Sequence, residues 1–135
     1  ITGTALQSYN QAVRTAYQAF QLAISNAEQT AISGGTQLNN TAVSSAVSAL
    51  QTSLGSAING LGTAFTSSTY NPTSTVTTQL SSLQSQLLAI AAPTAGNTVS
   101  ERLFLRTVSS VVDQSEGAIN QAVATAIQSY NNSLL

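Results

Sequence analysis

Hydrophobic residues recur every three or four positions along most of this chain, which is the spacing that gives a helix one apolar stripe. The repeat is interrupted at Gly34-Gly35, at Asn71-Pro72 and at Pro93. No useful length of sequence alternates with a period of two, as a half-buried strand would. The pattern therefore predicts an all-α protein with four helical segments.

The first segment is predicted to form a helix from Thr4 to Ser33. Apolar residues occupy every seventh position and also the positions three and four residues later, so the stripe is broad enough to pack against two neighbours. Gly34 and Gly35 are expected to end this helix, because glycine readily adopts the left-handed conformation found at many helix C-termini. The residues expected to face the core are Leu6, Tyr9, Val13, Ala16, Tyr17, Phe20, Ala23, Ile24, Ala27 and Ala31.

The second segment is predicted to run from Thr41 to Ser67, with a cap among residues 39–41. Three glycines in it lower helix stability by about 1 kcal/mol each relative to alanine. They either allow another helix to approach closely or mark a break near Gly60, and we favour close packing in one continuous helix. The glycines and the expected core positions are Gly55, Gly60, Gly62, and Val43, Val47, Leu50, Leu54, Ala57 or Ile58, Leu61 and Phe65.

The third and fourth segments differ in length by about a factor of two. The third is expected to start after a loop at residues 69–73, with Ser74 or Thr75 as its cap, and to stop before Pro93. The fourth starts at Thr98, which forms a capping box with Glu101, and continues to Leu134. The expected core positions of the two helices are Val76, Leu80, Leu83, Leu87, Ile90, Leu105, Val108, Val112, Ile119, Val123, Ala126 and Tyr130.

Short connections between four helices predict antiparallel neighbours. We therefore expect one domain over residues 1–135, folded as an antiparallel up-down-up-down four-helix bundle. In this bundle the C-terminal helix is long and the third helix is short.

Charged residues are scarce, with three basic and four acidic side chains and no histidine. A nucleic-acid partner is not expected, because phosphate binding needs clustered cations. No apolar run approaches the ~20 residues of a transmembrane helix. Cysteine is absent, so no disulfide supports the fold. The polar residues are mainly Ser, Thr, Asn and Gln, and such a neutral surface indicates an extracellular or particle-surface protein.

Two further features favour an extracellular location. The chain begins at Ile1 and contains no methionine, which is typical of a product whose signal peptide has been removed. Asn39 and Asn131 each begin an acceptor triplet for N-glycosylation, although such triplets are frequent by chance in a sequence this rich in Asn and Ser.

The charges suggest a register between the first and last helices. In an antiparallel pair, facing positions have a constant sum of residue numbers, and Arg14 with Glu116 has the same sum as Glu28 with Arg102. This match is either a register signal or a coincidence among exposed charges, since each pair contributes at most ~1 kcal/mol. In a rival arrangement the two arginines of the last helix pair with Asp113 and Glu116 of a second copy.

Catalytic, metal and cofactor sites are not expected. A nucleophilic Ser or Thr needs an adjacent base, and the chain has neither histidine nor lysine. Asp113 and Glu116 share a helix face, but the di-metal sites of helical bundles also use histidine. Arg102 and Arg106 lie one turn apart and fit salt bridges better than an anion clamp.

The predicted function is therefore structural and non-enzymatic. We expect a self-assembling helical subunit of an extracellular filament, fibre, coat or virion shell, whose partner is the protein itself as a homo-oligomer. The alternative is a secreted carrier that binds a small hydrophobic ligand, a fatty acid or a sterol, between its helices. Stability should respond weakly to pH between about 3 and 9, because no histidine titrates there.

Overall fold

Five helices and no strand make up the computed structural model, which describes residues 1–135. The prediction of an all-α protein is confirmed, but the chain forms five helices instead of four. The helices are α1 (Gly3–Gly34), α2 (Asn40–Asn59), α3 (Thr63–Thr66), α4 (Thr73–Ala89) and α5 (Thr98–Ser133).

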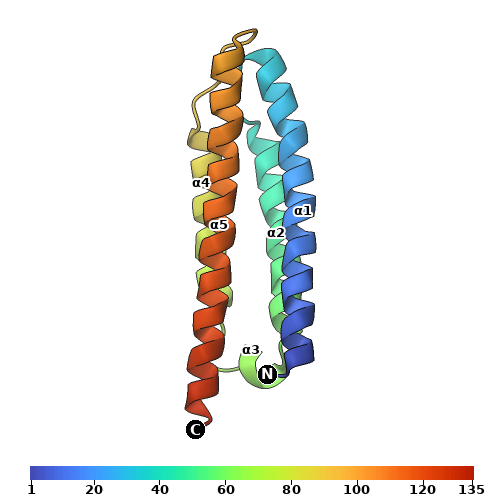
Figure 1. Ribbon diagram of the computed structural model, residues 1–135, viewed down its shortest axis with the longest axis vertical. Helices are drawn as coiled ribbons and strands as arrows, with labels where there is room; N and C mark the ends of the chain where they lie inside the picture. The colour runs from blue at the N-terminus through green and yellow to red at the C-terminus, as the bar shows by residue number, and fades with distance from the viewer.

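The four long helices lie side by side along the long axis of the molecule (Figure 1). The first, α1, leads away from the end that holds the N-terminus, and α2 returns to it; α4 and α5 repeat this course, and α3 crosses the end between them. Contacts are extensive between α1 and α2, between α4 and α5, and between α2 and α4, whereas α1 and α5 touch only slightly. The α1–α5 side is therefore the loosest of the four.

Local hydrogen bonds explain where α1 starts and stops. The Thr2 hydroxyl accepts a hydrogen bond from the Ala5 N–H at 3.0 Å, which caps the first turn. At the other end Gly35 has φ 63 and donates its N–H to the carbonyls of Ala31 and Ile32. The glycine pair thus ends the helix by the left-handed conformation that the sequence predicted.

The prediction of one continuous helix from Thr41 to Ser67 is wrong. The helix α2 ends at Asn59, and the chain turns through Gly62, whose φ of 126 is accessible to glycine but strained for other residues. A Cβ on Gly55 would meet no atom within 4 Å, so no helix approaches closely there. Of the two alternatives, the break near Gly60 is the one observed.

The short helix α3 closes one end of the bundle. Its Phe65 is buried and packs edge-on against Tyr130 of α5, with ring centroids 5.6 Å apart. Tyr70 in the following loop also packs edge-on against Tyr130, with ring centroids 6.2 Å apart. Phe65 is a predicted core position of the long helix. It is buried as predicted, although it lies in the separate helix α3.

Two predicted caps are also corrected. The helix α4 begins at Thr73, whose N–H and hydroxyl donate to the Asn71 side-chain oxygen at 2.9 and 2.6 Å, so neither Ser74 nor Thr75 is the cap. The cap of α5 is Asn97, not Thr98, and its side chain accepts from the Ser100 N–H at 3.0 Å.

Because Asn97 is the cap of α5, Glu101 does not form the predicted capping box with Thr98. Its carboxylate accepts the Gly96 N–H at 3.2 Å, one residue before the cap. At the start of α2, Asn39 is the cap and accepts the Ala42 N–H at 2.9 Å.

A single cluster of 28 buried apolar residues forms the core. Most of the predicted core positions belong to it. Leu6, Ala23 and Leu105 are exposed instead, and Ala126 and Tyr130 are partly buried and pack against the cluster. Leu105 is 40% exposed and Phe104 beside it is 3% exposed, because successive residues of a helix are turned by about 100°. Phe104, and not Leu105, therefore continues the buried stripe of α5.

Candidate functional site on the last helix

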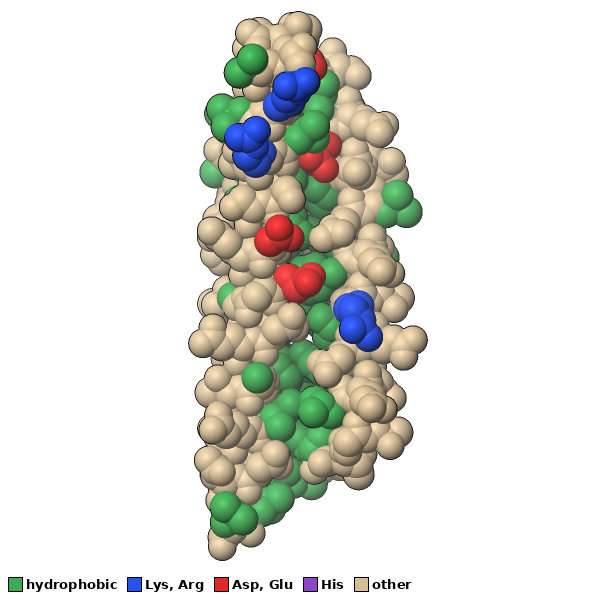
Figure 2. Space-filling model, in the orientation of Figure 1, with side chains coloured by type: hydrophobic (Ala, Val, Ile, Leu, Met, Phe, Trp, Pro, Cys, Tyr) green, Lys and Arg blue, Asp and Glu red, His purple; other side chains and the backbone are tan.

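Four charged side chains lie on one stripe of α5, and we call this set the charge stripe: Arg102, Arg106, Asp113 and Glu116. The helical spacing of three, four and seven residues brings them to one side of the helix, with the arginines nearer its start. Figure 2 shows the two basic side chains near one end of the molecule and two acidic ones further along the same helix. Glu116 is partly buried, and the other three are exposed.

This order of charges does not stabilise α5 by itself. Arg102 and Arg106 are four residues apart, and Asp113 and Glu116 are three apart, so like charges are neighbours on the helix surface. Neighbouring like charges destabilise an isolated helix by ~0.2–0.5 kcal/mol per pair. The arrangement therefore needs an explanation outside the helix.

The structure does not close the predicted pairs Arg14–Glu116 and Glu28–Arg102 as salt bridges. No arginine nitrogen lies within 4.0 Å of a carboxylate oxygen. Instead, Glu28 shares a cavity with Val108, more than one helical turn beyond Arg102. The register between α1 and α5 and the role of these charges in solution stay predictions.

The cavity between α1 and α5 has a volume of about 210 Å³. Burial raises the pKa of the Glu28 carboxyl at its wall. The lining residues are Gln21, Ile24, Ser25, Glu28, Val108, Ser109 and Val112. Polar side chains thus share the wall with apolar ones at the loosest helix contact in the molecule.

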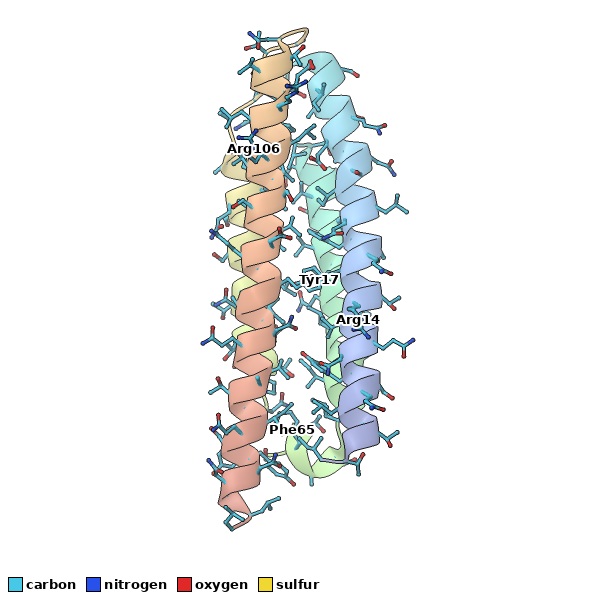
Figure 3. All side chains as sticks on the ribbon, viewed as in Figure 1. Arg14, Tyr17, Phe65 and Arg106 are labelled. Atoms are coloured by element: carbon cyan, nitrogen blue, oxygen red, sulfur yellow. The ribbon has the colours of Figure 1, made fainter.

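Three hydroxyl groups are buried without a hydrogen-bond partner, those of Tyr9, Tyr17 and Ser115. Figure 3 places Tyr17 between α1 and α5. Burial raises its pKa to about 12; the Ser115 hydroxyl works against this and the Glu116 carboxylate adds to it. Burial also raises the pKa of Tyr9 to about 12, with a smaller contribution from Tyr17. Ser115 is near enough to Tyr17 to influence it, although the two hydroxyls form no hydrogen bond.

Ser115 is a buried residue that the sequence analysis missed. It stands three residues after Val112 and four before Ile119, so it occupies a core position of the α5 stripe. The spacing contained this signal, but a serine at an apolar position is easily passed over in a chain so rich in serine.

Several large apolar side chains remain exposed. Val99 is 78% exposed and Leu103 is 61% exposed, and both lie on the outer side of α5 beside the arginines. Leu22 on α1 is 67% exposed. Gly117 is exposed too, and a Cβ there would meet no atom within 4 Å. The outer side of α5 thus combines apolar residues, ordered charges and a glycine that no contact within the chain requires.

The remaining predicted sites lie apart from this surface or have no cluster of ligands. Asn39 and Asn131 are exposed, and their glycosylation stays a prediction. No group of three or more His, Cys, Asp or Glu side chains is placed to hold a metal ion. None of the helices combines the length and hydropathy that a membrane span requires.

No protein-family model matches this chain, and neither a curated protein nor a solved structure is similar enough to match it. The residues of the chain itself therefore carry the evidence for its function.

Proposed function

We propose that this chain is a non-enzymatic, extracellular structural protein: an up-down-up-down helical subunit that self-assembles into a filament, fibre, coat or virion shell. The observation that carries the proposal is the exposed apolar surface of α5, where Val99 and Leu103 are 78% and 61% exposed. The core of 28 residues is formed without them. Contact with another molecule would remove these side chains from water, at ~25 cal/mol per Å².

The composition of the surface supports association between copies. The formal net charge is −1, so copies hardly repel one another. Exposed Gln, Asn, Ser and Thr side chains both donate and accept hydrogen bonds, which suits contacts between identical surfaces. With charges this sparse, the few that exist can decide how the copies are oriented.

Analytical ultracentrifugation over a wide concentration range tests the proposal. We expect a species larger than a monomer whose fraction rises with concentration. Leu103→Ser should reduce this fraction, whereas Leu22→Ser should change it little, as the matched control on α1. A wild-type protein that stays monomeric at the highest soluble concentration would overturn the proposal.

A second candidate function is carriage of a small hydrophobic ligand, such as a fatty acid or a sterol. It is favoured by one specific observation: the hydroxyls of Tyr17 and Ser115 are buried without a partner, and Tyr17 lies between α1 and α5, which touch only slightly. A polar end of a ligand could satisfy these groups. We place this candidate second because the cavity between α1 and α5, of about 210 Å³, holds only roughly seven waters at ~30 Å³ each, and neither Tyr17 nor Ser115 lines it.

Extraction of the purified protein with organic solvent, followed by mass spectrometry, distinguishes the two functions. A carrier would yield a stoichiometric lipid, and Tyr17→Phe would reduce the amount. An assembling subunit without extractable lipid would exclude carriage as its function.

A further inference from the structure

We propose that the outer face of α5 binds the same face of a second copy, with the two helices antiparallel about a two-fold axis near Ser109 and Ser110. This inference rests on the proposed self-assembly and names its first contact. It accounts with one partner for three features that the isolated chain leaves unexplained: the order of the charges, the exposed Val99 and Leu103, and the exposed Gly117.

The residues concerned follow one line along the helix. They recur at alternating steps of four and three residues, which is the seam of a helix that packs along a second helix. All of them are exposed, and they lie opposite the buried stripe that contains Val108 and Val112. The members of this outer seam are Val99, Leu103, Arg106, Ser110, Asp113 and Gly117.

The charges are complementary only when the second helix runs in the opposite direction. The arginines precede the serines and the acids follow them, so an antiparallel copy places Arg106 opposite Asp113 and Arg102 opposite Glu116. The two-fold axis repeats each pair, which makes four ion pairs of opposite sign. A parallel copy in register would oppose like charges at every one of these positions, which disfavours that orientation.

The apolar and small residues fit the same register. In the register that pairs Arg106 with Asp113, Val99 of one copy falls opposite Asn120 of the other. Leu103 falls opposite Glu116 and beside Gly117, where the missing side chain leaves room for it. The carboxylate of that Glu116 pairs with Arg102 of the copy that carries Leu103. Ser109 and Ser110 at the axis are small enough for the two helices to approach closely. The contact thus covers the exposed valine and leucine as it pairs the charges.

An isologous contact of this kind closes on itself and gives a dimer. A filament or shell therefore needs a second, different contact. Faces of the molecule other than the outer side of α5 therefore carry the contacts between dimers.

Charge reversal with mixing of variants tests the dimer contact. Arg106→Asp opposes carboxylates twice across the axis, so the dimer dissociation constant should rise by ~10-fold or more. Asp113→Arg should do the same with opposed guanidinium groups. A mixture of the two variants should form a heterodimer, because each new charge then meets an opposite charge on the other chain. The control is Arg14→Asp, which makes the same charge change on α1 and should leave the dimer intact.

Spin labels test the direction of the helices, and the absence of native cysteine makes the labelling specific. Labels on Ser110→Cys should lie close together near the axis. Labels on Asn120→Cys should be about 30 Å apart, because some 20 residues at 1.5 Å each separate the two positions along the helices. Equal, short distances at both positions would show a parallel pair and overturn the inference.

The outcomes separate this inference from the proposed function. A wild-type monomer at every concentration overturns both. If the wild type assembles and both charge reversals leave the assembly unchanged, self-assembly stands and the α5 contact is wrong. If the single variants lose the dimer and their mixture does not recover it, the pairing across the axis is wrong as well. Circular dichroism of each variant confirms that it remains helical.

Discussion

The hydroxyl of Tyr17 is buried without a hydrogen-bond partner, and a single substitution can measure what this costs. Leaving a buried polar group unsatisfied costs about 1–3 kcal/mol. Tyr17→Phe removes the hydroxyl and keeps the ring, so we expect the free energy of unfolding to rise by about 1 kcal/mol. Urea denaturation measures this, with the exposed Tyr70→Phe as a control that should change little.

A loss of stability in Tyr17→Phe would contradict this expectation. It would mean that the hydroxyl has a partner in solution, either a bound water or the polar end of a ligand. The same experiment therefore bears on the second candidate function.

Glu28 is a second residue whose pKa is changed by its surroundings. Burial raises its pKa, so the fold favours the protonated form. The resulting stabilisation is complete below the unfolded pKa of about 4.5 and is lost as pH rises through the higher folded pKa. We expect Glu28→Gln to stabilise the protein at pH 7 and to have little effect near pH 3.

Urea denaturation at the two pH values checks the sign of this effect. Asp113→Asn, at an exposed carboxylate, is the control, at a protein concentration low enough for the chain to be monomeric. An equal effect of Glu28→Gln at both pH values would show that packing, and not charge burial, is responsible. The prediction of a weak pH response did not include the raised pKa of this carboxyl.

At the scale of the element, the glycines of the second segment have different roles. Gly55 lies inside α2 with no atom near its absent Cβ, so Gly55→Ala should raise the free energy of unfolding by ~1 kcal/mol. Gly62 has φ 126, and Gly62→Ala should lower it by at least a similar amount, because an L-residue is strained there. Thermal and urea denaturation of the two variants give the comparison.

Opposite signs at these two positions would confirm that the break between α2 and α3 depends on a glycine conformation. Stabilisation by both alanines would contradict it. In that case the chain prefers the single long helix that the hydrophobic spacing predicts.

At the scale of the whole molecule, stability depends on a core shared by α1, α2, α4 and α5. Leu54 is 1% exposed inside it, so Leu54→Ala should lower the free energy of unfolding by ~2–5 kcal/mol. Leu22→Ala, at a residue 67% exposed, should change it by less than about 0.5 kcal/mol. Similar losses in both variants would show that Leu22 is covered by another molecule.

The loose contact between α1 and α5 is also a property of the whole molecule. The tight contacts run from α1 to α2, from α2 to α4 and from α4 to α5, which leaves the first and last helices as the least constrained pair. Tyr17 fills part of the space between these two helices.

The sequence determined the all-helical class, most of the core and the end of α1, because each depends on local rules. Apolar spacing identifies a buried stripe within one helix, and Gly35 acts through its own backbone angles. The predicted cap of α5 was displaced by one position because Asn97 and Thr98 can both accept the same N–H groups. The predicted cap of α4 was displaced by two or three positions because this helix starts after Pro72 without a side-chain cap.

Three features depend on tertiary packing and are not determined by the sequence pattern alone: the break after α2, the burial of Ser115 and the lack of salt bridges within the chain. A glycine costs the same helix stability whether it packs closely or ends the helix, so Gly55 and Gly62 are alike in the sequence. Which side of α5 is covered depends on residues far away in the chain, and this separates Phe104 from Leu105. The order of the charges along α5 is visible in the sequence. The absence of a salt-bridge partner within the chain is not, because the packing of the helices sets the distances between their charges.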